Sequence, residues 1–410
     1  PRMRTLPQVL HFTVECGVVI ANPPYVSYGL RGGQKMTSED KEILKNAFPN
    51  SAEYKISLYA LFMDKAIQIA KRNGGVQTFI VPDSFLLGRY FSKIRECILR
   101  VNEIGNILLL PYSVFDATVG FSVVYLFQRK GEVGGEHNVI ARFAEDNETI
   151  RQGLYKSYSY PQTYFHKLKH NRFRLFFDKP SMDLISKIEE NAVELGSIVK
   201  FSSGLIGKDG QDAIISNEKK GQKWLKGIIS GGEINRYVIV AEGNFLLYDK
   251  SKIKSGFECV EYFKEKLFMR QTGDSLICAC DDTGLLALNN VHIGNLIDES
   301  YSLKFVTAIV NSKLLNYYYK AISLEAGRVM AQTDIETVEG LPIKKPNDQK
   351  APVEIVDKIM QITKARGYQD NSSRLAEVRD YLKRIDRIIY KLYELTPEEI
   401  EMIENSSKKT

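Results

Sequence analysis

An amide, two prolines and an aromatic ring follow one another near the start of the chain, at Asn22, Pro23, Pro24 and Tyr25. The apolar run before them, residues 17–21, is typical of a short buried strand. Neither proline can donate a hydrogen bond to a sheet, so the strand is expected to end here. Because a residue before proline is held extended, we expect the Asn22 side chain to lie beyond the strand end. The carboxyl ends of strands are where open α/β sheets bind ligands.

These residue types fit one kind of chemistry. The Asn22 side-chain oxygen and the Pro23 carbonyl are hydrogen-bond acceptors, which suits a substrate that carries an NH₂ group. The Tyr25 ring beside them suits a flat substrate. Together they predict a site for the exocyclic amine of a nucleobase that has left its stack. The alternative is a strand followed by a Pro-Pro turn, with Tyr25 packed in the core.

The composition predicts a cytoplasmic, multidomain protein of the ordinary globular kind. The 410 residues exceed one compact core and indicate two or three domains. No apolar run reaches the roughly twenty residues of a membrane span, and the amino terminus has no signal-peptide pattern. The cysteines, five in number and never spaced as C-x-x-C, indicate a reducing compartment without structural zinc. The net charge of +6 permits a nucleic-acid partner.

Strands and helices alternate in the first part of the chain. The expected strands are residues 17–21, 76–81, 105–110 and 121–127, and the expected helices are residues 54–72 and 89–101. This pattern predicts an α/β sheet with crossover helices, ended by an antiparallel pair around Phe115. Residues 27–51 are expected to form a long polar loop. Residues 131–194 are expected to form a linker or connector, although residues 138–143 fit a further strand.

The remainder divides into an aromatic segment, a β-rich domain and a helical tail. Residues 151–178 interleave aromatic and basic side chains, which suits nucleic-acid contact and equally an amphipathic connector. Short strand patterns with many glycines predict a separate α+β domain over residues 195–345, with one helix at 305–319. Residues 353–365 and 373–392 are expected to form a helical pair within a tail over residues 350–410.

The Asn-Pro-Pro-Tyr signature opens a series of segments that resembles one enzyme family. The signature itself is similar to that of amino-group DNA methyltransferases. The later segments resemble, in the same order, the TaqI-type adenine methyltransferases and the type IIG restriction-modification enzymes built on them. These segments are residues 59–66, 74–82, 114–117, 269–273, 311–315, 340–343 and 385–396. The resemblance therefore covers nearly the whole chain.

The resemblance implies site-specific methyl transfer from S-adenosylmethionine to the exocyclic amine of a flipped adenine in double-stranded DNA. The setting that it implies is a bacterial or archaeal restriction-modification system. The catalytic residues that it implies are Asn22, Pro23, Pro24, Tyr25 and Phe115, and the cofactor contacts are Asn22, Pro24 and Phe62. Tyr25 and Phe115 are expected to stack on the base from opposite sides. The fold that it implies is the carboxyl-terminal part of a Rossmann-like methyltransferase sheet, in a catalytic domain over residues 1–130.

By the same resemblance, residues 195–345 form the target-recognition domain that reads the DNA sequence. Arg and Lys side chains dominate contacts with phosphates and with guanine. The candidate DNA contacts are Lys226, Arg236, Lys264, Lys266, Arg270 and Thr272. Arg270 is favoured, since it follows an apolar strand and precedes a polar turn at residues 271–273. For the other cations the alternative is a solvated face.

The sequence departs from the family pattern at its start. A Gly-rich cofactor turn should precede the signature, yet the 21 residues before Asn22 contain no G-x-G. We therefore expect the carboxyl-terminal portion of a longer enzyme, inactive alone, with its main cofactor motif and any nuclease region upstream. Such a half-sheet exposes an unpaired apolar strand edge. The alternative is a DNA-specificity module without its own catalysis.

Other patterns predict no further site. His166 and His170 are four residues apart, but no third ligand for zinc lies near them in the sequence. Asp40 and residues 53–55 mimic a nuclease pattern, although this family carries its nuclease upstream of the methyltransferase domain. No G-x-x-x-x-G-K-[ST] phosphate loop is present.

Overall fold

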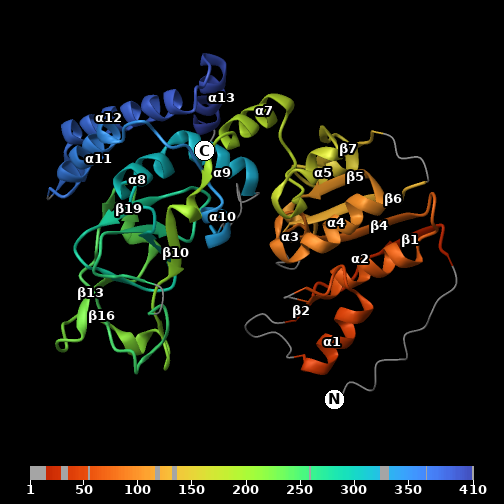
Figure 1. Ribbon diagram of the computed structural model, residues 1–410, viewed down its shortest axis with the longest axis horizontal. Coiled ribbons are helices and arrows are strands. Elements are labelled where there is room, and N and C mark those ends of the chain that lie inside the picture. Colours follow the sequence, from red (N-terminus) through yellow and green to blue (C-terminus); the bar gives the residue numbers. More distant parts are fainter. Residues whose placement is uncertain are drawn as a thin grey trace. The chain divides into compact units, whose positions relative to one another are not determined.

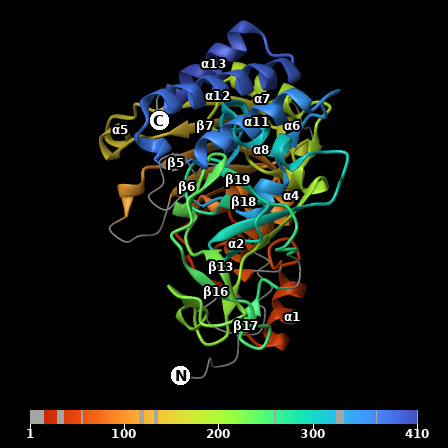
Figure 2. The ribbon, with the colours of Figure 1, turned by 90° about the vertical axis from the view of Figure 1, so that its left-hand side faces the viewer.

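The computed structural model describes most of the chain (Figures 1 and 2). The described residues are 15–28, 36–53, 56–115, 121–131, 136–257, 260–323, 332–365 and 367–408. Four features of the sequence lie outside them: the Gly-rich part of the loop at residues 31–35, residues 54–55 of the nuclease-like pattern, Cys259, and residues 116–117 of the Phe115 motif. The contacts divide the chain into two units, Pro1–Asp178 and Lys179–Thr410, which are described separately. Within the described residues, no helix is long and apolar enough to cross a membrane.

The first unit is built on one six-stranded sheet. Its strands are β1 (Val18–Ala21), β4 (Val76–Pro82), β5 (Asn102–Leu110), β6 (Ser122–Arg129), β7 (Asn138–Phe143) and β8 (Lys156–Pro161). Their order across the sheet is β1-β4-β6-β5-β7-β8. β1 and β4 are parallel, whereas β6 lies between β4 and β5 and is antiparallel to both. The antiparallel pair that the sequence predicts around Phe115 is therefore confirmed.

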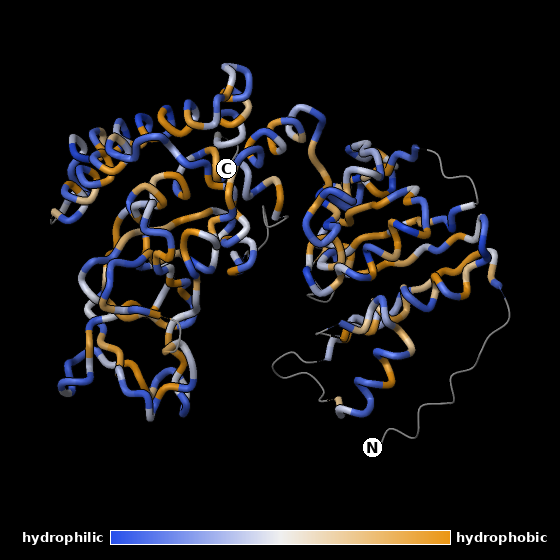
Figure 3. The backbone as a smooth tube through the Cα atoms, viewed as in Figure 1, coloured by the Kyte–Doolittle hydropathy of each residue, from blue (hydrophilic) through white to orange (hydrophobic). Residues whose placement is uncertain are grey.

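Helices and a small hairpin accompany this sheet. They are β2 (Ser27–Tyr28), β3 (Ile56–Ser57), α1 (Ser38–Ala47), α2 (Leu58–Ile69), α3 (Ser84–Leu87), α4 (Ser92–Val101), α5 (Asn147–Gln152) and α6 (Thr163–His166). α2 packs against α4 and β4, and α4 packs against β5. Hydrophobic residues run along the central strands (Figure 3). In the core, the rings of Tyr125 and Phe127 are stacked with centroids 3.9 Å apart. The mixed α/β character predicted from the sequence is confirmed.

The long loop expected over residues 27–51 contains a helix instead. α1 begins after Thr37, whose hydroxyl accepts a hydrogen bond from the backbone N–H of Asp40 at 3.0 Å. A threonine followed three residues later by an acid is a known start signal for a helix, although it is usually seen with glutamate. The many polar and charged residues of α1 hid this helix, because none of its side chains is fully buried.

The linker expected over residues 131–194 is wrong for its first part. Residues 138–161 form β7 and β8, where β7 pairs with β5 in parallel and β8 pairs with β7 in antiparallel. The aromatic segment that follows fills the core of the first unit, since Tyr160, Phe165 and Phe173 are at most 1% exposed. These three rings are therefore closed to bases. Tyr155, Tyr158 and Tyr164 of the same segment are partly exposed, and contact of residues 151–178 with nucleic acid stays a prediction.

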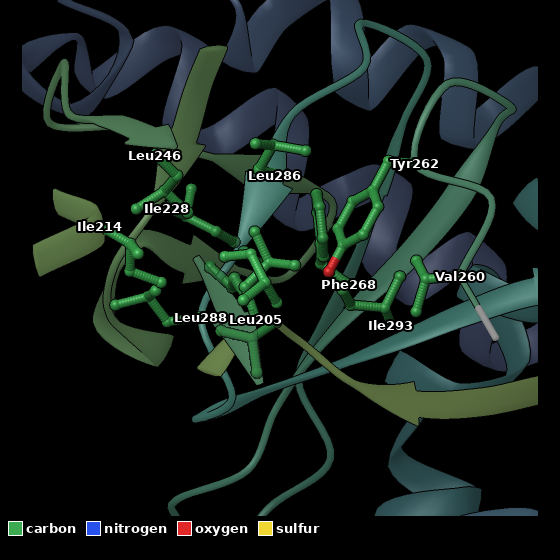
Figure 4. Close-up of a cluster of buried hydrophobic side chains, with 14 of the residues drawn as sticks. Leu205, Ile214, Ile228, Leu246, Val260, Tyr262, Phe268, Leu286, Leu288 and Ile293 are labelled. Carbon is green, nitrogen blue, oxygen red and sulfur yellow. The ribbon is translucent and has the colours of Figure 1, made fainter. Parts of the chain in front are cut away.

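The second unit contains many short strands. They are β9 (Val193–Glu194), β10 (Val199–Ser203), β11 (Ile206–Gly207), β12 (Ile215–Ser216), β13 (Trp224–Ile228), β14 (Ile234–Asn235), β15 (Val238–Ile239), β16 (Phe245–Leu247), β17 (Ile253–Ser255), β18 (Lys266–Arg270), β19 (Cys278–Asp281), β20 (Leu286–Ala287), β21 (Val291–Leu296) and β22 (Pro342–Ile343). One four-stranded sheet has the order β10-β21-β18-β19 and another has the order β12-β16-β13-β20. A single apolar cluster joins residues of both sheets, among them Leu246, Phe268 and Ile293 (Figure 4).

The helices of the second unit pack on the first of these sheets and on one another. They are α7 (Lys179–Glu189), α8 (Leu303–Asn311), α9 (Lys313–Ser323), α10 (Ile335–Glu339), α11 (Lys350–Thr363), α12 (Ser372–Leu392) and α13 (Pro397–Lys408). The one helix expected over residues 305–319 is two, because Ser312 takes an extended conformation with ψ 156°. α8 packs on β19 and α11, and both α12 and α13 pack on α9. The expected helical tail thus packs on the rest of the second unit.

A buried ion pair links β18 and β19 in the four-stranded sheet β10-β21-β18-β19. Lys266 on β18 and Asp281 on β19 are 0% and 2% exposed at their side chains, and their charged atoms are 2.5 Å apart. Lys266 also donates to the Tyr262 carbonyl at 2.6 Å. Burial lowers the pKa of Lys266, and the carboxylate opposes that shift. Lys266 therefore cannot contact a phosphate, so its candidacy as a DNA contact is wrong.

We predict that Lys266→Met destabilises the chain by about 3–5 kcal/mol, because it leaves the Asp281 carboxylate buried without its cation. Urea denaturation at neutral pH measures this loss. The control is Lys264→Gln, which breaks the exposed pair with Glu261 nearby and should leave stability nearly unchanged. Equal stability of Lys266→Met and the parent chain would show that the buried pair is not required.

Candidate active site

Three strand ends meet at one edge of the first sheet. Ala21 pairs with Phe79 in the parallel pair β1–β4, so the carboxyl ends of both strands lie at the same edge. Pro82 pairs with Ser122 in the antiparallel pair β4–β6, which brings the amino end of β6 to that edge. The Asp83 N–H donates to the Phe121 carbonyl at 3.1 Å. The signature, the segment after β4 and the segment before β6 are therefore neighbours.

The two predicted acceptors are free at this edge. Asn22 and Pro24 are exposed, and Pro23 is buried. Within the described residues, neither the Asn22 side chain nor the Pro23 carbonyl takes part in a hydrogen bond. The following segment is fixed in place, because the Leu58 N–H donates to the Val26 carbonyl at 2.9 Å. The signature thus presents two acceptors that have no partner among the residues that the structure describes.

The two aromatic residues that the sequence predicts to act together are in contact. The rings of Tyr25 and Phe115 have centroids 6.4 Å apart and are nearly perpendicular, with an angle of 87°. Tyr25 also contacts the buried ring of Tyr59, at 6.3 Å. The Tyr59 hydroxyl and the Ser84 hydroxyl are hydrogen-bonded at 3.0 Å, which ties this cluster to the segment after β4. Sequence reasoning found Tyr25 and Phe115 and missed Tyr59.

The Tyr25 hydroxyl is in an unusual environment. This hydroxyl and that of Ser122 are both buried, and neither has a well-aligned hydrogen-bond partner among the described residues. Burial raises the pKa of Tyr25, and the nearby Ser122 hydroxyl opposes the rise. Tyr25 is therefore uncharged at neutral pH and acts here as a flat ring with a polar tip.

A buried arginine holds the segment after β4. Arg95 on α4 is 0% exposed, and its guanidinium donates to the carbonyls of Phe85 and Gly88 at 2.7 and 2.8 Å. It also donates to the His170 carbonyl at 2.9 Å. These bonds fix the turn that carries Ser84. The sequence carried a signal for this residue, since Arg95 interrupts the apolar side of an amphipathic helix.

The predicted cofactor contact Phe62 is on the surface of the first unit. Phe62 lies on α2, one turn after Leu58, and is 47% exposed. β1 is the edge strand of the sheet as described, and its Val18 and Ile20 are 60% and 75% exposed. Phe62 and β1 both leave apolar side chains exposed, so the contact of Phe62 with a cofactor stays a prediction.

The predicted DNA contacts of the second unit differ in exposure. Lys226, Arg236 and Thr272 are exposed. Arg270 is partly buried, and its Nε and Nη2 donate to the Ile234 carbonyl at 2.5 Å and to Asn235 Oδ1 at 2.9 Å. Its Nη1 makes no hydrogen bond within the residues that the structure describes. Arg270 thus holds β18 to β14, and its contact with DNA stays a prediction.

Two family models match this chain. Residues 11–115 match the Eco57I restriction-modification methylase family, and residues 226–343 match the TaqI-like C-terminal specificity domain. The first match contains the signature and ends at Phe115, whereas the second contains Arg236, Arg270 and Thr272. The resemblance to restriction-modification methyltransferases of this class, predicted from the sequence, is confirmed.

Individual relatives agree with these matches. A protein of Methanocaldococcus jannaschii, provisionally named a type II restriction enzyme and methyltransferase, is 24% identical over 401 residues, which cover 93% of this chain and 32% of the relative. This chain therefore spans about a third of that relative's length. The structure of the type IIL restriction-modification enzyme MmeI in complex with DNA aligns at TM-score 0.61 and 15% identity, over 96% of this chain and 57% of MmeI. The DrdV–DNA complex aligns at TM-score 0.52 and 10% identity, over 84% and 44%. At these identities the two structures show similarity of fold.

We predict that Arg270→Ala lowers the free energy of unfolding by about 1.5–3 kcal/mol, the usual range for hydrogen bonds from a charged group. Urea denaturation measures the loss, whether or not DNA is present. Thr272→Ala is the control, because that side chain is exposed and its removal should cost less than about 0.5 kcal/mol. If both variants are as stable as the parent chain, the bonds to Ile234 and Asn235 have no structural role.

Proposed function

We propose that this chain is the amine-binding and DNA-reading part of an adenine-specific DNA methyltransferase in a restriction-modification system. One observation carries the proposal: the free acceptors of Asn22 and Pro23 lie beside the Tyr25–Phe115 contact. The two family matches support the coarser class, a restriction-modification methylase with a specificity domain. The order β1-β4-β6-β5 supports its assignment to the end of a Rossmann-like methyltransferase sheet.

Under this proposal, Asn22 and Pro23 make a poor nucleophile reactive. The lone pair of the adenine amine is delocalised into the ring, so the nitrogen is weakly nucleophilic. Its two N–H groups donate to Asn22 Oδ1 and to the Pro23 carbonyl, which draws the nitrogen towards a tetrahedral state. These bonds strengthen as positive charge develops on the nitrogen, and they therefore stabilise the transition state more than the ground state. No strong base is required.

Tyr25 and Phe115 hold the flipped base between them. Two rings with a base in between are separated by about 6.8 Å, twice the 3.4 Å step of stacked bases. The centroid distance of 6.4 Å is close to this separation, but the perpendicular rings require one of them to turn when the base enters. Stacking contributes about 1–3 kcal/mol per ring. That gain offsets the few kcal/mol that extrusion of the base costs.

The cofactor that this chemistry requires is S-adenosylmethionine. When bound, it supplies an electrophilic methyl group on a sulfonium sulfur. The exposed ring of Phe62 offers it an aromatic surface, and Asn22 and Pro24 are exposed after the carboxyl end of β1. We assign the remaining cofactor contacts to residues outside this chain, because this chain spans about a third of the length of its relative.

The proposal assigns sequence reading to the second unit. The match to the specificity domain and the DNA complexes of the structural neighbours support a double-stranded DNA partner. Lys226, Arg236 and Thr272 are exposed and suited to phosphate or base contact. Arg270 can add a contact through its free Nη1.

We predict that Asn22→Ala abolishes adenine methylation while DNA binding stays within about twofold. The full reading frame is expressed in cells, and the methylated adenines in their DNA are mapped by sequencing, which also gives the target sequence. Loss of one preorganised hydrogen-bonding group typically lowers a rate by about 10²–10³-fold.

Two outcomes would reject this assignment. Comparable loss of DNA binding and methylation in Asn22→Ala would indicate a structural role for Asn22. Absence of methylated adenines with the parent frame, together with no binding of S-adenosylmethionine in calorimetric titration, would favour a DNA-specificity module without catalysis.

We predict that Phe115→Ala weakens base flipping, because one of the two stacking surfaces is lost. With 2-aminopurine at the mapped target position, its fluorescence on binding should rise less than with the parent protein. Tyr112→Ala is the matched control, since Tyr112 is an exposed aromatic residue three positions earlier. Unchanged fluorescence and an unchanged rate in Phe115→Ala would assign Phe115 to structural packing alone.

A further inference from the structure

Four cations lie on α12 at intervals of four residues: Arg379, Lys383, Arg387 and Lys391. We call them the α12 cation row. Residues four apart are neighbours on one face of a helix, about 6 Å apart along its axis. The row therefore extends over about 18 Å. All four side chains are exposed.

Carboxylates do not neutralise this row. None of its four cations forms an ion pair within the part of the chain that the structure describes. Glu377 and Asp380 are the exposed carboxylates of α12, against six cations on the same helix. Glu404 on α13 faces the row, but it is already paired with the Lys313 ammonium and accepts a hydrogen bond from the Tyr390 hydroxyl at 2.8 Å.

The core fixes the direction in which the row faces. Ile385 and Ile389 on the other side of α12 are at most 1% exposed. Asp386 accepts a hydrogen bond from the Lys313 N–H at 3.0 Å, which joins α12 to the start of α9. Three members of the row, with Lys313 and Glu404, line a hollow of about 600 Å³. The row is therefore part of a firmly held, concave surface.

The positive charge of Arg236, a residue that the sequence predicts to contact DNA, acts on Asp386 of α12. Burial raises the pKa of Asp386, and the positive charges of Lys313 and Arg236 oppose the rise. Arg236 is exposed and follows Asn235, the partner of Arg270.

We propose that the α12 cation row binds the phosphate backbone of double-stranded DNA, so that DNA contact extends beyond the specificity-domain match at residues 226–343. The inference rests on the proposed function, which provides the DNA partner. Like charges at regular intervals of about 6 Å suit a polyanion of regular spacing, and 18 Å corresponds to about five base-pair steps. Phosphate contacts position a protein on DNA and carry no sequence information. The row therefore sets affinity and register, whereas other residues read the bases.

The experiment measures binding of the full chain to a labelled duplex by fluorescence anisotropy over a series of salt concentrations. Each phosphate contact contributes about 0.9 to the slope of log K against log salt. We expect Arg387→Gln to lower that slope by about 0.9, and Lys383→Gln/Arg387→Gln/Lys391→Gln to lower it by about 2–3. Affinity should fall by the same factor on duplexes of unrelated sequence.

Two control variants test whether the slope depends on the position of a cation and on its charge. Arg374→Gln removes one exposed cation of the same helix that lies off the row, and it should leave the slope unchanged. Arg387→Lys keeps the charge and should keep the slope.

Three results would overturn the inference. The first is an unchanged slope in the triple variant while the parent chain binds DNA, which leaves the proposed function intact. The second is an equal decrease in Arg374→Gln and Arg387→Gln, which indicates a general charge effect. The third is a parent chain that binds no DNA, which removes the DNA partner of the proposed function as well.

Discussion

The position of β6 between β4 and β5 is the constraint on which the candidate site depends. β1, β4 and β5 run in one direction, and β6 runs against β4 and β5, so three carboxyl ends and one amino end meet at a single edge. This is what brings Phe115, which precedes β6, to the ring of Tyr25, which follows β1. Phe115 lies between the carboxyl end of β5 and the amino end of β6, and both of these ends are at this edge.

Buried cations give both units local rigidity. In the first unit Arg95 donates hydrogen bonds to two carbonyls of the turn after β4. In the second unit Lys266 pairs with Asp281 and donates to the Tyr262 carbonyl. A buried charge is costly unless it is paired or hydrogen-bonded. The surrounding backbone is therefore restrained to the geometry that satisfies it. In the first unit this restraint reaches Ser84, and through Ser84 the aromatic cluster of the candidate site.

Sequence patterns did not predict the structure of segments whose contacts are with residues far away in the chain. The sequence predicts a connector over residues 131–194 with a further strand at residues 138–143 only, yet β5 offers an edge on which both β7 and β8 complete the sheet. The cations of the second unit show the same limit. Lys266 and Arg270 lie on one strand, but their partners Asp281 and Ile234 come from other strands. Spacing along one segment does not reveal such partners.

The sequence by itself determined the local chemistry of this protein. The acceptors of Asn22 and Pro23, the strand that ends before them and the regular cations of α12 follow from residue type and spacing, because they depend only on nearby residues. The tertiary structure alone decided which side chains are free. Asn22 remains without a partner in the described chain, whereas Lys266 is buried in an ion pair. The physical reason is that burial and pairing depend on strands from distant parts of the chain. The free energy of those contacts therefore cannot be inferred from any one segment.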